Sequence, residues 1–156
     1  IVPPVGADTE FADMQAAYDA LDAAAKNRIT GLHVHHSIAY SRQTLGFEFS
    51  PEEEEKLKGA VHPLIRVNPR TQRCSLYLAA HATRIIEMPL PEGRLLLRDL
   101  TEHATQREFV YRHVWRDRDL VIWDNLATMH RATPFDDARH LRELRRVTTL
   151  DIERVA

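Results

Sequence analysis

Apolar residues recur along the chain at two spacings, which predict helices in some stretches and strands in others. Between Asp13 and Lys26 they recur every three to four positions, at Met14, Ala17, Leu21 and Ala24. This spacing places them on one face of an amphipathic helix, and the alanine-rich composition favours a helix as well. The sequence therefore predicts a helix over 13–26 that packs on a sheet.

Two further helices are predicted from their start signals and apolar spacing. Ser50 precedes Pro51 and the run EEEEKLK, which supplies an N-cap, a proline at the first helical position and an acidic first turn. We expect a short solvated helix there, and we read its glutamates as hydrated surface. The segment PEGRLLLRDLTEHATQ predicts a longer helix over 91–106.

The other stretches alternate or end at turn residues, as short strands do. Residues 31–40 alternate, and the segment VHPLIRVNPRTQRCSLYLAAH predicts two strands around a turn at Asn68–Thr71. In the C-terminal third, EFVYRHVW, DLVIWDN and ELRRVTTLDI predict three more strands. Short strands with inserted helices predict a mainly β fold such as a jelly roll, formed by one domain over 1–156.

Composition and charge exclude several classes of partner. A net charge of −2 creates no field that would gather nucleic acid or an anionic membrane surface. No apolar run approaches the roughly 20 residues of a transmembrane helix, and the start has no signal-peptide pattern. Cys74 is the single cysteine, which excludes an internal disulfide and favours a reducing compartment. We therefore expect a cytoplasmic protein, and the sequence leaves a homo-oligomer open.

Candidate chemistry is concentrated near the C-terminus. In the predicted last strand, one face carries Arg142, Leu144, Arg146, Thr148 and Leu150. If this face is inward, two guanidinium groups about 13 Å apart enter the core, and they need anionic partners such as two carboxylates. A solvated strand face stays open as the simpler interpretation.

Histidine is the other candidate, because the chain has nine. Most are expected to be structural or exposed. His33, His35 and His36 project to opposite faces of one strand, and the others lack a partner at metal-ligand spacing. His130 differs, because it follows a strand ending in Trp123-Asp124-Asn125 and precedes the two arginines. This position places a metal-capable imidazole near the same cavity.

Several ordered motifs resemble one enzyme family. WDNLATMH, continuing through RATPFDDARHLRELRRVTTL, is similar to the C-terminal signature of the taurine / 2,4-dichlorophenoxyacetate dioxygenase family of Fe(II)- and 2-oxoglutarate-dependent dioxygenases. PPVGADTEFADMQAAYDAL resembles the family's PP-x-G-G-D-T segment, with Ala7 in place of the second glycine. HATQREFVYRH resembles the aryloxyalkanoate branch. The resemblance implies a double-stranded β-helix, or jelly roll.

The resemblance also implies roles for individual residues. His130 matches the distal iron ligand and would be catalytic, while Thr9 and Arg142 match the residues that bind the distal carboxylate of 2-oxoglutarate. Arg146 matches the residue that meets the acidic group of the substrate. Trp123 matches a tryptophan near the iron, where its role would be packing. Each inward arginine would then have a carboxylate partner suited to its planar fork.

One family motif is missing. The expected facial triad joins two histidines and a carboxylate, and two of these come from a His-x-Asp/Glu motif. None of the nine histidines is followed two residues later by Asp or Glu. The chain also begins on Ile1 rather than Met. We expect the jelly roll to be incomplete at the N-terminus, with about 100 further residues upstream that carry the motif. The fragment alone is then expected to be inactive.

The implied activity is hydroxylation of a small organic acid by dioxygen, coupled to decarboxylation of 2-oxoglutarate to succinate. An aryloxyalkanoate substrate would undergo ether cleavage. One alternative is a catalytically inactive jelly-roll domain that binds an anion or mediates assembly. A zinc hydrolase is less favoured, since it would need three protein ligands and the sequence shows no second ligand motif.

Overall fold

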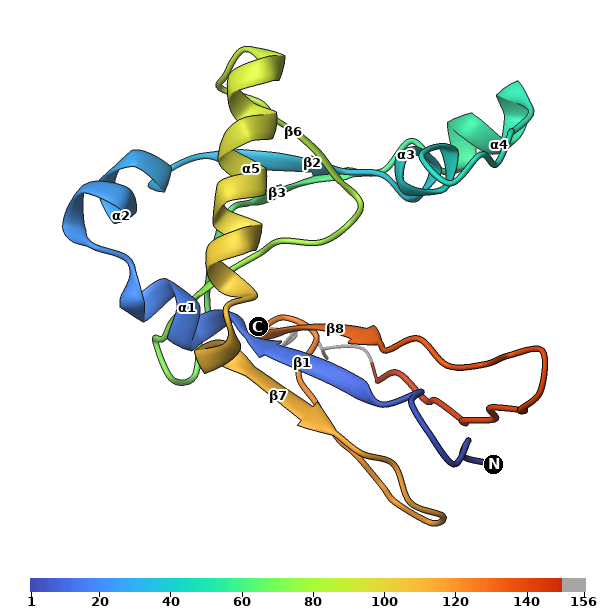
Figure 1. Cartoon of the computed structure of the whole chain (residues 1–156). Coiled ribbons are helices and arrows are strands. Elements are labelled where there is room, and N and C mark those ends of the chain that lie inside the picture. The colour runs from blue at the N-terminus through green and yellow to red at the C-terminus, as the bar shows by residue number, and fades with distance from the viewer. Residues whose placement is uncertain (150–156) are drawn as a thin grey trace.

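The structure, a computed structural model, describes residues 1–149, and its strands form three small antiparallel sheets. In Figure 1 the sheet β3-β2-β6 crosses the upper part of the long helix α5, and the sheet β7-β1-β8 extends from its lower end. The lower sheet contains β1 (Thr9–Asp13), β7 (Val110–His113) and β8 (Thr128–Ala132). The upper sheet contains β2 (His33–His36), β3 (Ala60–Pro63) and β6 (Ala82–Ile85). Antiparallel strands with inserted helices are thus the architecture expected from the sequence.

A third sheet is the hairpin of β4 (Ile65–Val67) and β5 (Cys74–Leu76). Its turn begins at Asn68, whose side-chain oxygen accepts hydrogen bonds from the backbone N–H groups of Arg70 and Thr71. Asn favours turns because its side chain can bond the backbone two or three residues ahead. The predicted turn is therefore confirmed.

The helix predicted over 13–26 is two helices in the structure, α1 (Met14–Ala20) and α2 (Ala23–Ile29). Each begins at an aspartate whose carboxylate accepts hydrogen bonds from first-turn N–H groups, Asp13 for α1 and Asp22 for α2. Such a cap stabilises a helix by about 1 kcal/mol. The prediction of one continuous helix was wrong, because a second N-cap lies inside the alanine-rich stretch.

The strand predicted over 31–40 is shorter in the structure. It ends at His36, and α3 (Ile38–Gln43) begins after Ser37, whose hydroxyl accepts the N–H of Tyr40. The helix predicted after Ser50 is confirmed as α4 (Pro51–Lys56), which has a reciprocal capping box between Ser50 and Glu53. The capping signal at Ser50 therefore located the start of α4, whereas α3 was not predicted from the sequence.

The core lies between the sheets and α5 (Leu90–Ala104), which confirms the helix predicted over 91–106. The buried face of α5 consists of Gly93, Leu96, Leu97, Leu100 and Ala104. These residues pack with Met14, Ala17, Ile29, Val34, Leu64, Leu76 and Ile85. Each fully buried leucine or isoleucine contributes about 1.5 to 3 kcal/mol. Within residues 1–149, no helix has the length and apolar composition needed to cross a membrane.

The C-terminal third departs most from the predicted strands. EFVYRHVW supplies only β7, after the single-turn helix η1 (Arg107–Phe109). DLVIWDN forms no strand, and its Leu120 and Ile122 are 84% and 86% exposed. A strand needs a neighbour that pairs with its backbone groups, and in the described part of the chain this segment has none. The strand prediction for DLVIWDN was therefore wrong, while β8 was not predicted.

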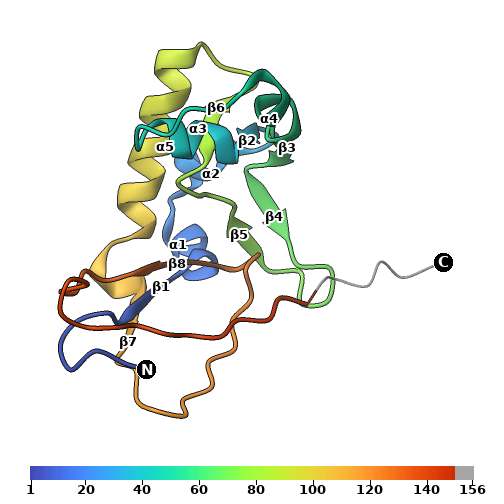
Figure 2. The same cartoon turned by 90° about the vertical axis from the view of Figure 1, so that its right-hand side faces the viewer.

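The predicted strand ELRRVTTLDI is also not a strand over 143–149, and its last three residues lie outside the described residues. Its backbone makes one reciprocal pair, in which Glu143 and Ile1 each donate an N–H to the other's carbonyl, at 2.9 and 3.1 Å. Figure 2 shows this segment in red, alongside the sheet that contains β1 and β8. The face that carries Leu144 and Arg146 is not buried, since Leu144 is 38% exposed and Arg146 is exposed.

Candidate functional site

The candidate site lies on one face of the sheet β7-β1-β8. On β1, Thr9 and Phe11 share a face because they are two residues apart. Phe11 stands directly opposite His130 of β8, and Thr9 stands opposite His113 of β7. Side chains of directly opposed residues in an antiparallel pair project to the same face. Strand register therefore places the Thr9 hydroxyl and the His130 imidazole on one surface.

Thr9 is the most enclosed of the predicted site residues. It is 7% exposed, and its hydroxyl oxygen accepts two hydrogen bonds. One comes from the guanidinium of Arg142, with 3.3 Å between Nη2 and Oγ1, and the other from the indole of Trp115 at 2.9 Å. The two predicted 2-oxoglutarate ligands, Thr9 and Arg142, are thus in direct contact. Trp115 was not singled out from the sequence, because its bond to Thr9 joins residues 106 positions apart.

The loop before β1 holds Arg142 by a second bond. The Nε of Arg142 donates to the carbonyl of Ala7 at 3.1 Å. Gly6 and Ala7 both have positive φ, at 76° and 59°. Ala7 occupies the position where the family pattern has glycine, and an L-residue in this region costs about 1 to 2 kcal/mol. The left-handed backbone at this position is therefore present without the glycine.

An ion pair between a buried carboxylate and an exposed arginine stabilises the same loop. Asp8 is 6% exposed, and its carboxylate lies 2.6 Å from the guanidinium of Arg112 on β7. The carbonyl of Asp8 also accepts the N–H of Thr133, just beyond β8, at 2.8 Å. Because these contacts connect the loop to both outer strands, they restrict the position of Thr9.

His130 lies at the exposed surface of β8 and packs against aromatic rings. Its ring centroid is 5.1 Å from that of Trp123 and 6.0 Å from that of Phe11. Partial burial and, to a smaller extent, the positive charge of Arg146 lower the pKa of His130 below its ordinary value. The neutral imidazole is therefore favoured, and this is the form that binds metal ions.

Arg146 is exposed, and its charge acts on His130. The structure therefore brings Arg142 into contact with Thr9, and it places Arg146 close enough to His130 for its charge to act on that imidazole. Across residues 1–149, no three His, Cys, Asp or Glu side chains are grouped so that they could hold a metal ion. Of the residues matched to the family's iron ligands, the described chain contains His130, and one imidazole by itself does not hold iron tightly.

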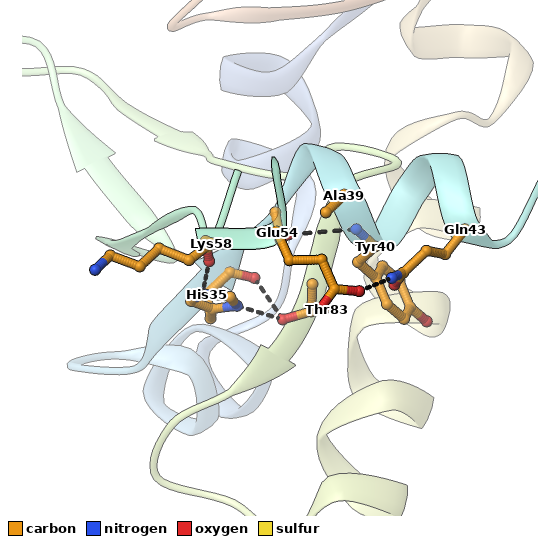
Figure 3. Close-up of a pocket in the computed structure, with 8 residues that line it drawn as sticks. His35, Ala39, Tyr40, Gln43, Glu54, Lys58 and Thr83 are labelled. Atoms are coloured by element: carbon orange, nitrogen blue, oxygen red, sulfur yellow. Dashed lines mark hydrogen bonds between the residues drawn. The ribbon is translucent and has the colours of Figure 1, made fainter. Parts of the chain in front are cut away.

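Two cavities lie elsewhere, in the upper sheet and its helices. The larger, about 340 Å³, is shown in Figure 3 between β2, α3 and α4. There His35 uses both ring nitrogens, one with the hydroxyl of Thr83 and one with the carbonyl of Lys58, each at 2.8 Å. Because both of its ring nitrogens are bonded within the fold, His35 has a structural role. The cavity is not lined by Thr9, His130 or Arg142.

The second cavity, about 220 Å³, contains a histidine cluster made of His36, His62 and His81 beside Tyr77. The Nδ1 atoms of His36 and His81 are 3.5 Å apart, and the ring centroids of His36 and His62 are 5.8 Å apart. Burial, with smaller effects from its histidine neighbours, lowers the pKa of His36 to about 4. No spacing in the sequence indicated this cluster, because its members come from separate strands and a loop.

Comparison with known proteins places these observations in a family context. Residues 1–148 match the family described as taurine catabolism dioxygenase TauD, TfdA family. The chain is 46% identical over 152 residues to an alpha-ketoglutarate-dependent 2,4-dichlorophenoxyacetate dioxygenase of Cupriavidus pinatubonensis. This match covers 97% of this chain and 53% of that relative. The chain is 39% identical to an (S)-phenoxypropionate/alpha-ketoglutarate dioxygenase of Sphingobium herbicidovorans, covering 87% of this chain and 50% of that relative.

A solved structure gives the corresponding comparison in three dimensions. The crystal structure of AAD-2 in complex with Mn(II) and N-oxalylglycine superposes with a TM-score of 0.86 at 53% sequence identity. The match covers 90% of this chain and 56% of that one. The chain thus spans about half the length of the proteins it resembles.

Proposed function

Because the chain belongs to the TauD, TfdA dioxygenase family, we propose that the whole protein is an Fe(II)- and 2-oxoglutarate-dependent dioxygenase acting on a small aryloxyalkanoic acid. The observation that carries this proposal is the contact between Thr9 and Arg142 on the sheet face that also presents His130. The 2,4-dichlorophenoxyacetate and (S)-phenoxypropionate dioxygenases among its relatives support the substrate class.

Thr9 and Arg142 would bind the distal carboxylate of 2-oxoglutarate. A guanidinium presents parallel N–H groups that match a carboxylate, and a hydroxyl adds one more donor. Thr9 is buried, so little water competes for the bound carboxylate. The bond from Arg142 to the Ala7 carbonyl holds the guanidinium in place before the ligand arrives.

His130 would be a ligand of the iron, and its protonation state fits that role. Its pKa is lowered, so the imidazole is available to a cation without first losing a proton. Fe(II), when bound, would supply chelation of the 2-oxo acid and activation of dioxygen. The remaining two ligands would come from the half of the relatives' length that this chain does not match. The same half would complete the family's jelly roll, with residues 1–156 forming one part of a single domain.

Arg146 would meet the carboxylate of the substrate near His130. Its exposed guanidinium is accessible to an acidic ligand, and positioning of the substrate carbon is the main task left to the protein. One oxygen atom of dioxygen enters succinate as carbon dioxide leaves, and the other enters a substrate C–H bond. Hydroxylation beside the ether oxygen of an aryloxyalkanoate gives a hemiacetal, which collapses to a phenol and an oxo acid.

The alternative of an anion-binding or assembly domain would also explain the arginines. The relatives do not favour it, because two are named as alpha-ketoglutarate-dependent dioxygenases and the third is in complex with an analogue of alpha-ketoglutarate. The test is succinate formation by the full-length protein with Fe(II), 2-oxoglutarate and a panel of acids. We expect 2,4-dichlorophenoxyacetate and (S)-phenoxypropionate to stimulate succinate and phenol release more than taurine does. Stimulation by sulfonates alone, or by no acid, would overturn the proposal.

A further inference from the structure

Trp115 makes a polar contact that packing alone does not require. It follows β7 and is half-buried, and its ring packs edge-on against His113 with centroids 4.6 Å apart. Its indole N–H donates to the hydroxyl oxygen of Thr9 at 2.9 Å. His113 is itself held by Asp119, with 3.0 Å between Nε2 and Oδ2. The indole is thus fixed from two sides.

The bond from Trp115 restricts the direction in which the Thr9 hydroxyl can donate its own proton. A threonine hydroxyl has one O–H donor and two acceptor lone pairs. The guanidinium of Arg142 and the indole of Trp115 direct donors at the same oxygen, at 3.3 and 2.9 Å. Neither group can accept a hydrogen bond there, so the proton of Thr9 must point to a third direction. An acceptor-only group, such as a carboxylate, satisfies that requirement.

We propose that Trp115 is a positioning residue for 2-oxoglutarate, whose indole N–H holds the Thr9 hydroxyl as an obligate donor to the distal carboxylate. This inference rests on the proposed function, because it assumes that the carboxylate binds at Thr9 and Arg142. The benefit is preorganisation: the ligand meets a hydroxyl that has already lost its rotational freedom. Trp115 acts through Thr9 and does not contact the ligand itself.

The experiment is a double-mutant cycle on the full-length protein loaded with Mn(II), with N-oxalylglycine affinity measured by calorimetry. Trp115→Phe keeps the ring and removes the N–H, while Thr9→Val keeps the shape and removes the hydroxyl. One neutral hydrogen bond corresponds to about 1 kcal/mol, or about fivefold in affinity. We expect Trp115→Phe to weaken binding about fivefold in the parent protein and to have no further effect in the Thr9→Val background.

A purely structural role for Trp115 predicts a different result. Trp115→Phe would then weaken binding by the same factor in both backgrounds, because the two changes would be independent. Tyr111→Phe is the matched control, since Tyr111 also lies beside His113 but has its hydroxyl 3.3 Å from that ring and not on Thr9. Its affinity should equal that of the parent.

Further measurements complete the test. The KM for 2-oxoglutarate should rise in Trp115→Phe while the KM for the aryloxyalkanoate stays unchanged. Equal effects in both backgrounds, or no effect of Trp115→Phe in the parent, would overturn the inference alone. Failure of the unsubstituted protein to bind N-oxalylglycine would overturn the proposed function together with it.

Discussion

The guanidinium of Arg142 lies 3.3 Å from the hydroxyl of Thr9, although the two residues are 133 positions apart in the sequence. The same arginine donates to the carbonyl of Ala7. A cation that is already bonded on one side to the backbone and on the other to a hydroxyl is prepared for a carboxylate. This relationship allows the roles of the site residues to be tested one at a time.

Arg142→Ala should weaken 2-oxoglutarate binding about ten- to a hundredfold. A hydrogen bond to a charged group contributes about 1.5 to 3 kcal/mol, and the carboxylate would lose its counter-charge. Arg142→Lys should keep only part of the 2-oxoglutarate affinity that Arg142→Ala loses, because an ammonium lacks the planar fork of a guanidinium. The measurement is calorimetric titration of 2-oxoglutarate. Arg145→Ala, which removes a nearby exposed arginine, is the control, and an equal loss there would contradict the assignment.

Arg146→Ala should leave 2-oxoglutarate affinity nearly unchanged and raise the KM for the aryloxyalkanoate. Its charge acts on His130, near which the substrate carbon must be held, whereas the arginine bonded to Thr9 is Arg142. A poorly positioned substrate should also uncouple succinate formation from phenol release. Both products are measured in the same reactions. A variant that loses 2-oxoglutarate affinity instead would reverse the roles of the two arginines.

His130→Ala should abolish iron-dependent succinate formation and leave the fold intact. Loss of a ligand removes the metal, whereas an exposed imidazole that packs on Trp123 and Phe11 contributes little to the core. Succinate assay and thermal unfolding check the two halves of the prediction. His140→Ala removes an exposed histidine outside the site and should retain activity. Normal turnover in His130→Ala would mean that the iron is bound elsewhere.

Gly6→Ala should destabilise the protein more than Gly31→Ala, although both glycines have φ of +76°. The left-handed conformation costs each alanine about 1 to 2 kcal/mol. A Cβ on Gly6 would also lie 2.5 Å from the carbonyl oxygen of Pro134, whereas a Cβ on Gly31 meets nothing within 4 Å. The displaced loop should carry Thr9 with it, so only Gly6→Ala should weaken 2-oxoglutarate binding. Urea unfolding and calorimetry compare the pair, and equal destabilisation would show that the Pro134 contact is unimportant.

Stability should fall as the pH drops from about 6.5 to about 4. The pKa of His36 is lowered from 6.5 to about 4, so over this range the unfolded chain binds a proton that the folded protein excludes. Its contribution is full above pH 6.5 and lost below about pH 4, and at about 1.4 kcal/mol per pKa unit it is on the order of 3 to 4 kcal/mol. The lowered pKa of His81 acts in the same direction.

Urea unfolding between pH 4 and 7.5 measures this loss. His36→Gln removes the titrating group at the centre of the histidine cluster and should flatten the pH dependence. An unchanged slope in that variant would assign the effect to other groups.

The sequence alone determined the features that depend on neighbouring residues. Ser50 with Glu53 located the start of α4, Asn68 located the turn between β4 and β5, and the apolar period located α5. Caps, turns and helical periodicity act within a few residues, so their signals are legible without the fold. The motif resemblance also indicated the family, which the comparisons confirm.

The tertiary structure decided the features that depend on which backbones pair. DLVIWDN alternates like a strand but has no partner among the described residues, while β8 is a strand because β1 lies beside it. The bond from Trp115 to Thr9 and the histidine cluster join residues far apart in sequence. Such contacts follow from strand register, and a shift of one residue moves a side chain to the opposite face. Only the folded chain specifies that register, so only the fold identifies Trp115 as a neighbour of the site.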